Sequence, residues 1–235
     1  MRLTRREALL ATGALALSRP AHAAADDAGV GSVADIVNYA WSTVAPEPRE
    51  EIEFEDAVFM NELIETDDES AVVVHFADGS KLTVGENARV VVDRYVYDPG
   101  GSSTQAITLS KGAFRYLSGA IPKENVKIQT PSVTIGIRGT ELLLDVADDG
   151  ETEMSTIVGE ADCTDGAGET LTVGAEQSVL VGGDRRFRGR VRRGRHRSRS
   201  VAVDEGLDGA RKRWRVRKEK KRRAQRRRRR RRNND

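Results

Sequence analysis

Few side chains in this sequence can act as nucleophiles, general bases or soft metal ligands. The chain has one cysteine, Cys163, and its histidines are His22, His75 and His196. A reactive thiol needs a neighbouring base, and a zinc site or a Ser-His-Asp triad needs histidine placed beside its partners. We therefore expect no catalytic residue, no metal site and no cofactor, and we expect Cys163 to be packed or solvent-facing.

Two acidic clusters, ETDDE at 65–69 and DDGE at 148–151, carry enough carboxylates to suggest calcium binding. Neither cluster has the full carboxylate spacing of an EF-hand loop. Solvated charges in turns are the simpler interpretation, and we expect no calcium site in either cluster.

Arginine gathers at the C-terminus, where it can bind a charged partner. Residues 185–235 hold 26 Lys and Arg against 5 Asp and Glu, whereas residues 1–184 hold 13 against 32. Arginine binds phosphates through paired hydrogen bonds, and tryptophan can insert at a membrane interface or stack on a base. The pattern predicts a tail that binds anionic lipid, polysaccharide or nucleic acid through Arg211, Arg213, Trp214, Arg226, Arg227, Arg228, Arg229, Arg230, Arg231 and Arg232.

Other interpretations of this tail stay open. Its positive charge could fold back on the acidic body of the chain, or the segment could have no role. Like charges and few apolar residues favour disorder over 185–235. Good helix formers over 209–225 predict a helix that forms when a polyanion neutralises its charges.

The N-terminus has the pattern of an export signal. Arg2, Arg5 and Arg6 precede an apolar run at 8–17, and Ala21 and Ala23 form an A-x-A cleavage site. The Arg5-Arg6 pair also resembles a twin-arginine signal. An apolar helix of about ten residues rises about 15 Å, too short for a hydrocarbon core of about 30 Å. We therefore predict a signal peptide at 1–23, no membrane helix in the mature chain, and a periplasmic or secreted location.

After a lead-in at 24–49, the chain changes to short β-type runs separated by turn residues. This pattern predicts an all-β domain over 50–184, and the sequence does not choose between a sandwich and a short solenoid. In the run at 88–97, Arg94 interrupts the face that Val90 and Val92 begin. The expected strands are 71–76, 81–84, 88–97, 105–109, 113–117, 126–129, 133–137, 141–146, 154–158, 170–173 and 177–181.

Four ordered segments resemble the FecR domain family: FADGSKLTVGENAR at 76–89, LSKGAFRYLSG at 109–119, VKIQTPSVTIGIRGT at 126–140 and VGEA at 158–161. We expect the motif residues to be mainly structural, although Arg138 could bind either a nearby carboxylate or a ligand anion. The motif residues are Asp78, Gly79, Ser80, Gly85, Gly112, Pro131, Gly136, Arg138, Gly139 and Thr140.

The resemblance implies an exported domain of envelope signalling proteins that binds a partner. Family members of this type usually add a cytoplasmic segment and a membrane helix, which this sequence does not show. We therefore expect a non-enzymatic module that binds an envelope protein or surface ligand, with the basic tail as a tether. The alternative is a nucleic-acid-binding protein that acts through its tail.

Overall fold

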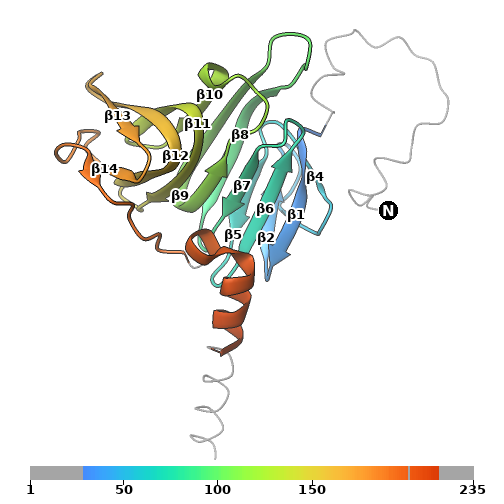
Figure 1. Cartoon of the computed structure of the whole chain (residues 1–235). Helices are drawn as coiled ribbons and strands as arrows, with labels where there is room; N and C mark the ends of the chain where they lie inside the picture. The colour runs from blue at the N-terminus through green and yellow to red at the C-terminus, as the bar shows by residue number, and fades with distance from the viewer. Residues whose placement is uncertain (1–28, 201, 217–235) are drawn as a thin grey trace, which may run out of the picture.

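The computed structural model describes residues 29–200 and 202–216. The predicted leader with Ala21 and Ala23, and the arginine run at 226–232, lie outside this range. Strands hold about half of the described residues and most of the regular secondary structure, which confirms the all-β prediction (Figure 1). Its strands are β1 (Gly31–Val37), β2 (Ala40–Thr43), β3 (Glu50–Glu51), β4 (Ala57–Val58), β5 (Leu63–Thr66), β6 (Ala71–Phe76), β7 (Lys81–Val84), β8 (Arg89–Val96), β9 (Thr104–Leu117), β10 (Val126–Gln129), β11 (Val133–Val146), β12 (Thr152–Asp165), β13 (Thr170–Gly174), β14 (Gln177–Val181) and β15 (Arg192–Arg193).

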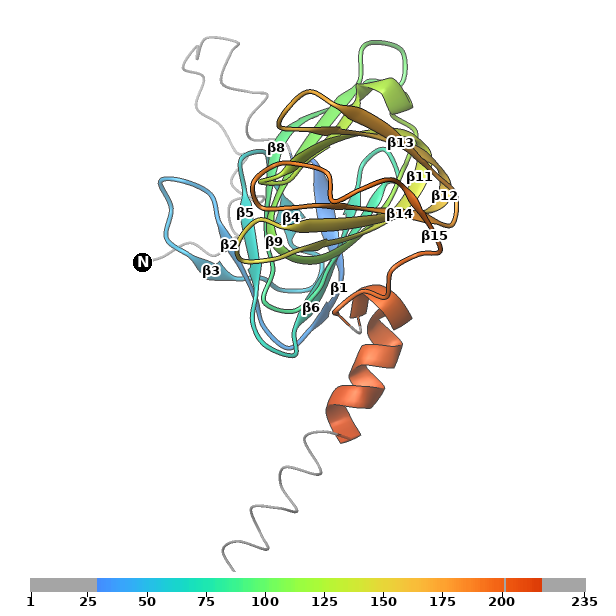
Figure 2. The ribbon, with the colours of Figure 1, turned by 90° about the vertical axis from the view of Figure 1, so that its left-hand side faces the viewer.

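All these strands belong to one hydrogen-bonded sheet. Two branches leave the long strand β9: one runs through β8 and β5 to β2 and β3, and the other through β7 and β6 to β1 and β4. The branches fold over one another, and Phe76 of β6 stacks on Tyr95 of β8 with ring centroids 5.5 Å apart. The result has two layers like a sandwich, but they are joined by continuous strands (Figure 2).

The core between the layers is mainly aliphatic, as low aromatic content predicts. It contains Ile64, Val74, Leu82, Ile107 and Ile135, all at most 1 % exposed. Burial of such side chains is the main favourable term in folding. The same cluster continues through β11, β12 and β14, so one main core extends along most of the sheet.

Glycines let the long strands pass from one layer to the other. The first half of β9 pairs with β8 and β10, whereas its second half pairs with β7 and β11. The change occurs at Gly112, whose φ is 106°. A Cβ at Gly112 would lie 2.3 Å from the Cβ of Ala88. Because glycine alone adopts this φ without strain and allows this approach, one strand replaces the two predicted at 105–109 and 113–117.

A β-bulge explains why Arg94 interrupts the apolar face of β8. The pairing of β8 with β9 shifts between Val92 and Arg94. The extra residue reverses the alternation, so Val90, Val92 and Tyr95 are buried while Arg94 is exposed. The expectation that Arg94 lies on the face of Val90 and Val92 is therefore wrong, since the residues change faces at the bulge.

The sheet extends beyond the predicted boundary at residue 50. Strand β1 pairs with β6 from Gly31 to Val37, and β2 pairs with β5. Val33 and Ala40 lie in the main core. Part of the lead-in at 24–49 thus contributes β1 and β2 to the same sheet and core.

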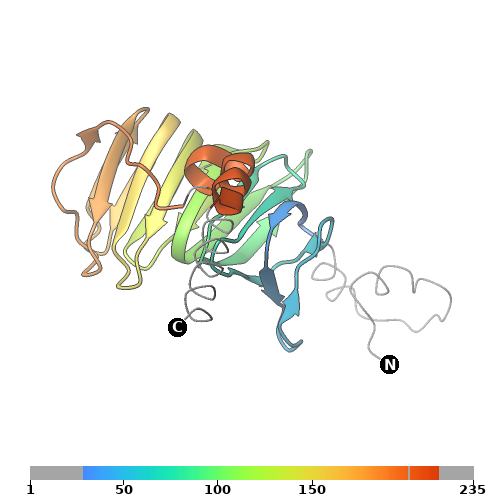
Figure 3. The ribbon, with the colours of Figure 1, turned by 90° about the horizontal axis from the view of Figure 1, so that it is seen from below.

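The first part of the basic tail packs on the sheet. Strand β15 pairs with β14, and a helix at 202–216 lies against the outer surface of the sheet (Figures 1 and 3). Here we call residues 195–200 and 202–216 the C-terminal strap. The expectation of disorder is wrong for these residues, and the alternative in which the tail folds back on the body holds for them.

Candidate functional site

The D-G-S motif builds a buried polar turn between β6 and β7. Asp78 Oδ1 accepts hydrogen bonds from the Ser80 hydroxyl (2.6 Å), the Ser80 amide (3.1 Å) and the Tyr95 hydroxyl (3.1 Å). Asp78 Oδ2 accepts the amide of Ile121 at 3.3 Å. Gly79 takes a φ of 81° at the turn. This carboxylate therefore joins the hairpin, β8 and the segment after β9.

The same network continues into the core through Gln105. The Tyr116 hydroxyl donates to Gln105 Oε1 at 2.5 Å, and Gln105 Nε2 lies 3.4 Å from the Ser80 hydroxyl. Burial raises the pKa of Tyr116 and of Tyr95 well above the ordinary value. Both phenols therefore stay protonated and serve as hydrogen-bond donors.

The second group of motif residues shapes the turns around β11. Thr130 Oγ1 accepts the amides of Ser132 and Val133, which closes the tight turn that contains Pro131. Gly139 takes a φ of 72° where the pairing of β11 with β12 is irregular. Thr140 and Ser118 then exchange backbone and side-chain hydrogen bonds. These residues shape the turn before β11 and the irregularity within it.

Arg138 binds a nearby carboxylate, one of the two roles that the sequence left open. Its Nε and Nη2 lie 3.0 and 2.7 Å from Asp162 Oδ2. The Thr172 hydroxyl, followed by Arg138, holds the pKa of Asp162 below its usual range. A shallow groove of about 590 Å³ runs beside this pair, past Gly136 and Lys123. The role of Arg138 in binding an anion stays untested.

The reactive side chains considered at the sequence level are placed where they do little chemistry. Cys163 is buried in the core, and this burial raises its thiol pKa to about 12. Burial and the nearby Lys81 lower the pKa of His75. Within residues 29–200 and 202–216, no group of three or more His, Cys, Asp and Glu residues could hold a metal ion.

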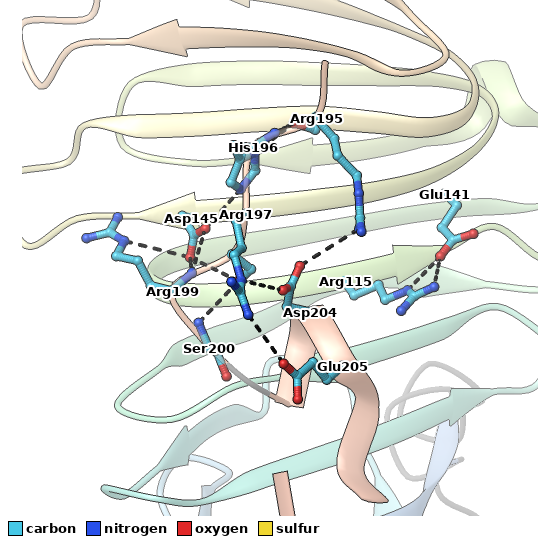
Figure 4. Close-up of polar contacts among 12 residues, drawn as sticks. Arg115, Glu141, Asp145, Arg195, His196, Arg197, Arg199, Ser200, Asp204 and Glu205 are labelled. Carbon is cyan, nitrogen blue, oxygen red and sulfur yellow. Dashed lines mark hydrogen bonds and ion pairs between the residues drawn. The ribbon is translucent and has the colours of Figure 1, made fainter. Parts of the chain in front are cut away.

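Sequence reasoning missed a buried polar cluster that fastens the strap to the outer face (Figure 4). His196 Nε2 lies 2.9 Å from Asp145 Oδ2, and its Nδ1 lies 2.7 Å from Ser155 Oγ. The side chains of His196 and Asp145 are only 5 % and 3 % exposed. Asp145 also accepts hydrogen bonds from Ser198 and from the Arg199 amide. An aspartate inside the apolar run at 142–146 was the signal for such a partner.

His196 is hydrogen-bonded to both Ser155 and Asp145, as the histidine of a Ser-His-Asp hydrolase triad would be. Here, however, the cluster acts as a clamp that holds the C-terminal strap on the sheet. Ser155 is fully buried, and its oxygen accepts the His196 backbone N–H at 2.9 Å. A nucleophile must reach a substrate carbonyl in a cleft. The cluster therefore holds the strap in place.

Motif residue Gly85 makes room for the same strap. A Cβ at this position would lie 2.4 Å from the Ser200 hydroxyl. The Gly85 amide donates to the Ala113 carbonyl at 2.8 Å, which fixes the local backbone. The family-like segment and the basic tail are thus in direct contact.

The predicted polyanion-binding residues that the structure describes are occupied within the chain. Trp214 is 4 % exposed and packs with Val37, Ala71, Leu207 and Ala210. Arg211 Nη2 lies 2.5 Å from Asp35 Oδ1, and Arg213 pairs with Glu205. In this conformation Trp214 is covered by the chain itself, and its predicted role in binding a polyanion stays a prediction.

Comparisons with known proteins give one family model, and the similar solved structures include two that are described below. Residues 62–162 match a family model described as FecR protein. Two crystal structures described as a "putative anti-sigma factor" from Parabacteroides distasonis ATCC 8503 align with TM-scores of 0.44 and 0.45 at 12 % identity. Each alignment covers 57 % of this chain and 59 % of that protein, so the chain spans about three fifths of their length. No curated protein matches the chain.

Proposed function

We propose that this chain, whose residues 62–162 match the FecR family model, is an exported, non-enzymatic module that binds a partner in the cell envelope and takes part in signalling. The observation that carries the proposal is the family match, which coincides with the four ordered motifs and with the centre of the sheet. The FecR resemblance implies regulation rather than catalysis.

The geometry supports binding over catalysis. The motif residues are engaged in turns, bends and buried hydrogen bonds, as Asp78 and Gly112 illustrate. The nucleophilic groups Cys163 and Ser155 are fully buried. A partner would therefore meet the outer surfaces of the sheet.

The uncovered part of the outer face offers apolar side chains for such contact. Glu141 of β11 pairs in register with Leu117 of β9 on one side and Val158 of β12 on the other. Leu117 and Val158 are both exposed. Arg115 holds Glu141 in an ion pair, so charged groups lie beside the two apolar ones. Apolar contacts flanked by polar groups are typical of protein interfaces.

Export is supported by the sequence at 1–23, with cleavage after Ala23. None of the helices in residues 29–200 and 202–216 is long and apolar enough to cross a bilayer. We propose a periplasmic or secreted location for the mature chain.

In-cell photocrosslinking tests the proposal. A photoreactive residue at position 117 or 158 should give an adduct of one discrete mass in the envelope fraction, with an N-terminus at residue 24. The same probe at Lys127, an exposed position on β10, is the matched control. An intact N-terminus, or adducts absent from every position tested, would overturn the proposal.

A further inference from the structure

The helix at 202–216 has two distinct faces. After Gly206, the buried side chains Leu207, Ala210 and Trp214 recur at spacings of three and four residues and form one stripe, and Val203 is buried before that glycine. Lys212, Arg213 and Arg215 are exposed on the remaining surface. This combination of an apolar stripe with tryptophan and a basic polar face is typical of helices that lie in a lipid interface.

The contact of this helix with the sheet is narrow. Leu207, Ala210 and Trp214 meet Val37 and Ala71, with Val73 partly buried beside them. Val203 packs separately on Ala113 and Leu143. Most of the residues in these two small clusters are alanine or valine, so the apolar area that the helix covers is limited.

Two features indicate that the packing of the helix on the sheet is imperfect. Within the described residues, the Trp214 indole N–H is buried without a hydrogen-bond partner, and tryptophan normally finds one. Gly206 takes a φ of 78° inside the helical segment, which bends it. A lipid interface would supply hydrogen-bond acceptors to the indole.

The clamp at His196 precedes the helix in the chain and would stay bound to the sheet if the helix moved. His196, Ser198 and Arg199 are bonded to Asp145, whereas the helix end is held by the Arg211 pair with Asp35. The Arg211 side chain is partly exposed, and ion pairs of this kind weaken with salt or with a competing anion.

We propose that the helix at 202–216 leaves the sheet and binds an anionic lipid surface, while the clamp at His196 keeps it attached to the domain. Lipid phosphates would replace Asp35 and Glu205 as partners of Arg211 and Arg213. The apolar stripe would enter the interface instead of the sheet. The chain that follows supports this binding, because 13 of its last 19 residues are Lys or Arg.

The apolar stripe favours lipid over nucleic acid as the partner. A nucleic acid would attract the same arginines, but it offers no apolar phase for Leu207 and Ala210. At about 1.5 Å per residue the helix is about 22 Å long, which suits a position in the plane of the interface rather than across the membrane. The inference does not depend on which protein the domain binds.

Moving the helix would uncover a second apolar area on the outer face. Val37 and Ala71 would lose their cover, and Ala113 and Leu143 would become accessible beside the Glu141 region. The lipid surface would thereby control how much of the outer face is open to a partner.

Two single-tryptophan variants of residues 24–235 test the proposal, because the chain has only two tryptophans. Trp41→Phe leaves Trp214 as the reporter, and Trp214→Phe leaves Trp41 on β2, where its indole bonds to Asp67 at 2.9 Å. Each variant is mixed with vesicles of equal parts phosphatidylglycerol and dibrominated phosphatidylcholine. Bromine quenches only tryptophan that enters the lipid.

We expect the bromolipid to quench most Trp214 emission and to leave Trp41 emission unchanged. Vesicles of dibrominated phosphatidylcholine alone should quench neither. The further changes Lys212→Gln and Arg215→Gln should weaken Trp214 quenching several-fold, since both side chains lie on the exposed face of the helix.

Three results would overturn the proposal. Trp214 could stay unquenched whether or not the protein sediments with the vesicles, which would leave the helix on the sheet. Both reporters could be quenched, which would indicate unfolding at the lipid surface. Single-stranded DNA could shift Trp214 emission as much as the anionic vesicles do, which would make charge alone responsible.

Discussion

Asp78 shows how one carboxylate can join segments that lie far apart in the sequence. It accepts hydrogen bonds from Ser80, Tyr95 and Ile121, which belong to different parts of the fold. Hydrogen bonds to a charged group contribute more than neutral ones, and buried donors left without an acceptor are costly. We therefore expect the motif aspartate to act on folding rather than on a ligand.

We predict that Asp78→Ala lowers the free energy of unfolding by about 3 kcal/mol, because several buried donors lose their acceptor. Urea unfolding followed by circular dichroism measures the change. The matched control is Asp93→Ala, since Asp93 is exposed at the bulge of β8, and its effect should stay within about 0.5 kcal/mol. Equal effects of the two substitutions would contradict the structural role of Asp78.

Because of Cys163, we expect the free energy of unfolding to depend on pH in the alkaline range. Its pKa is about 12 in the folded chain, against about 8.5 in an unfolded chain. Between these values the unfolded state releases the thiol proton and the folded state keeps it, so stability falls as pH rises. Below about pH 8 this contribution is fully present.

We predict that the stability advantage of the native chain over Cys163→Ala shrinks by about 2 kcal/mol between pH 7 and pH 10. Comparing the two proteins cancels the titration of tyrosines and lysines that they share. Urea unfolding at each pH gives the difference. A gap that stays constant with pH would show that the thiol is accessible in the folded state.

At the scale of strands, glycines set where the chain turns from one layer to the other. Gly112 combines a φ of 106° with close contact to Ala88. Gly136 has no atom within 4 Å of the position its Cβ would occupy, although both glycines belong to the family-like motifs. Only the first of them is required by the local geometry.

We predict that Gly112→Ala lowers the free energy of unfolding by at least about 3 kcal/mol through backbone strain and overlap. Gly136→Ala should change it by less than about 1 kcal/mol. Thermal and urea unfolding of the two variants provide the test. Similar losses at both positions would mean that β9 does not need its bend at Gly112.

Local pattern was sufficient to predict many strands. The ranges expected for β6, β7, β10 and β14 are those of the structure, because alternating apolar residues and turn residues bound each run. The pattern failed where one residue changes the phase, as at the bulge before Arg94. It also divided β9 and β11, since a glycine within a run looks like a turn when its pairing partners are unknown.

At the scale of the whole molecule, charge composition indicated contact between tail and body without giving its location. Trp214 packs against Val37 and Ala71, which are more than a hundred residues away from it in the chain. His196 likewise finds Asp145 across 51 positions. Contacts between residues so far apart leave no periodic pattern in the local sequence. The sequence alone could therefore not decide whether the basic tail folds back on the body or binds a polyanion.

The same limit applies at the N-terminal boundary, and it gives a test of where the domain begins. Strand β1 covers one edge of β6 along most of its length, and β2 covers β5. We predict that the chain shortened to 50–216 loses its cooperative unfolding transition, because two sheet edges and core residues near Val33 become exposed. The chain shortened to 29–216 should unfold cooperatively at the temperature of 24–235. Scanning calorimetry compares the three, and a cooperative transition for 50–216 at the same temperature would place the domain boundary after β2.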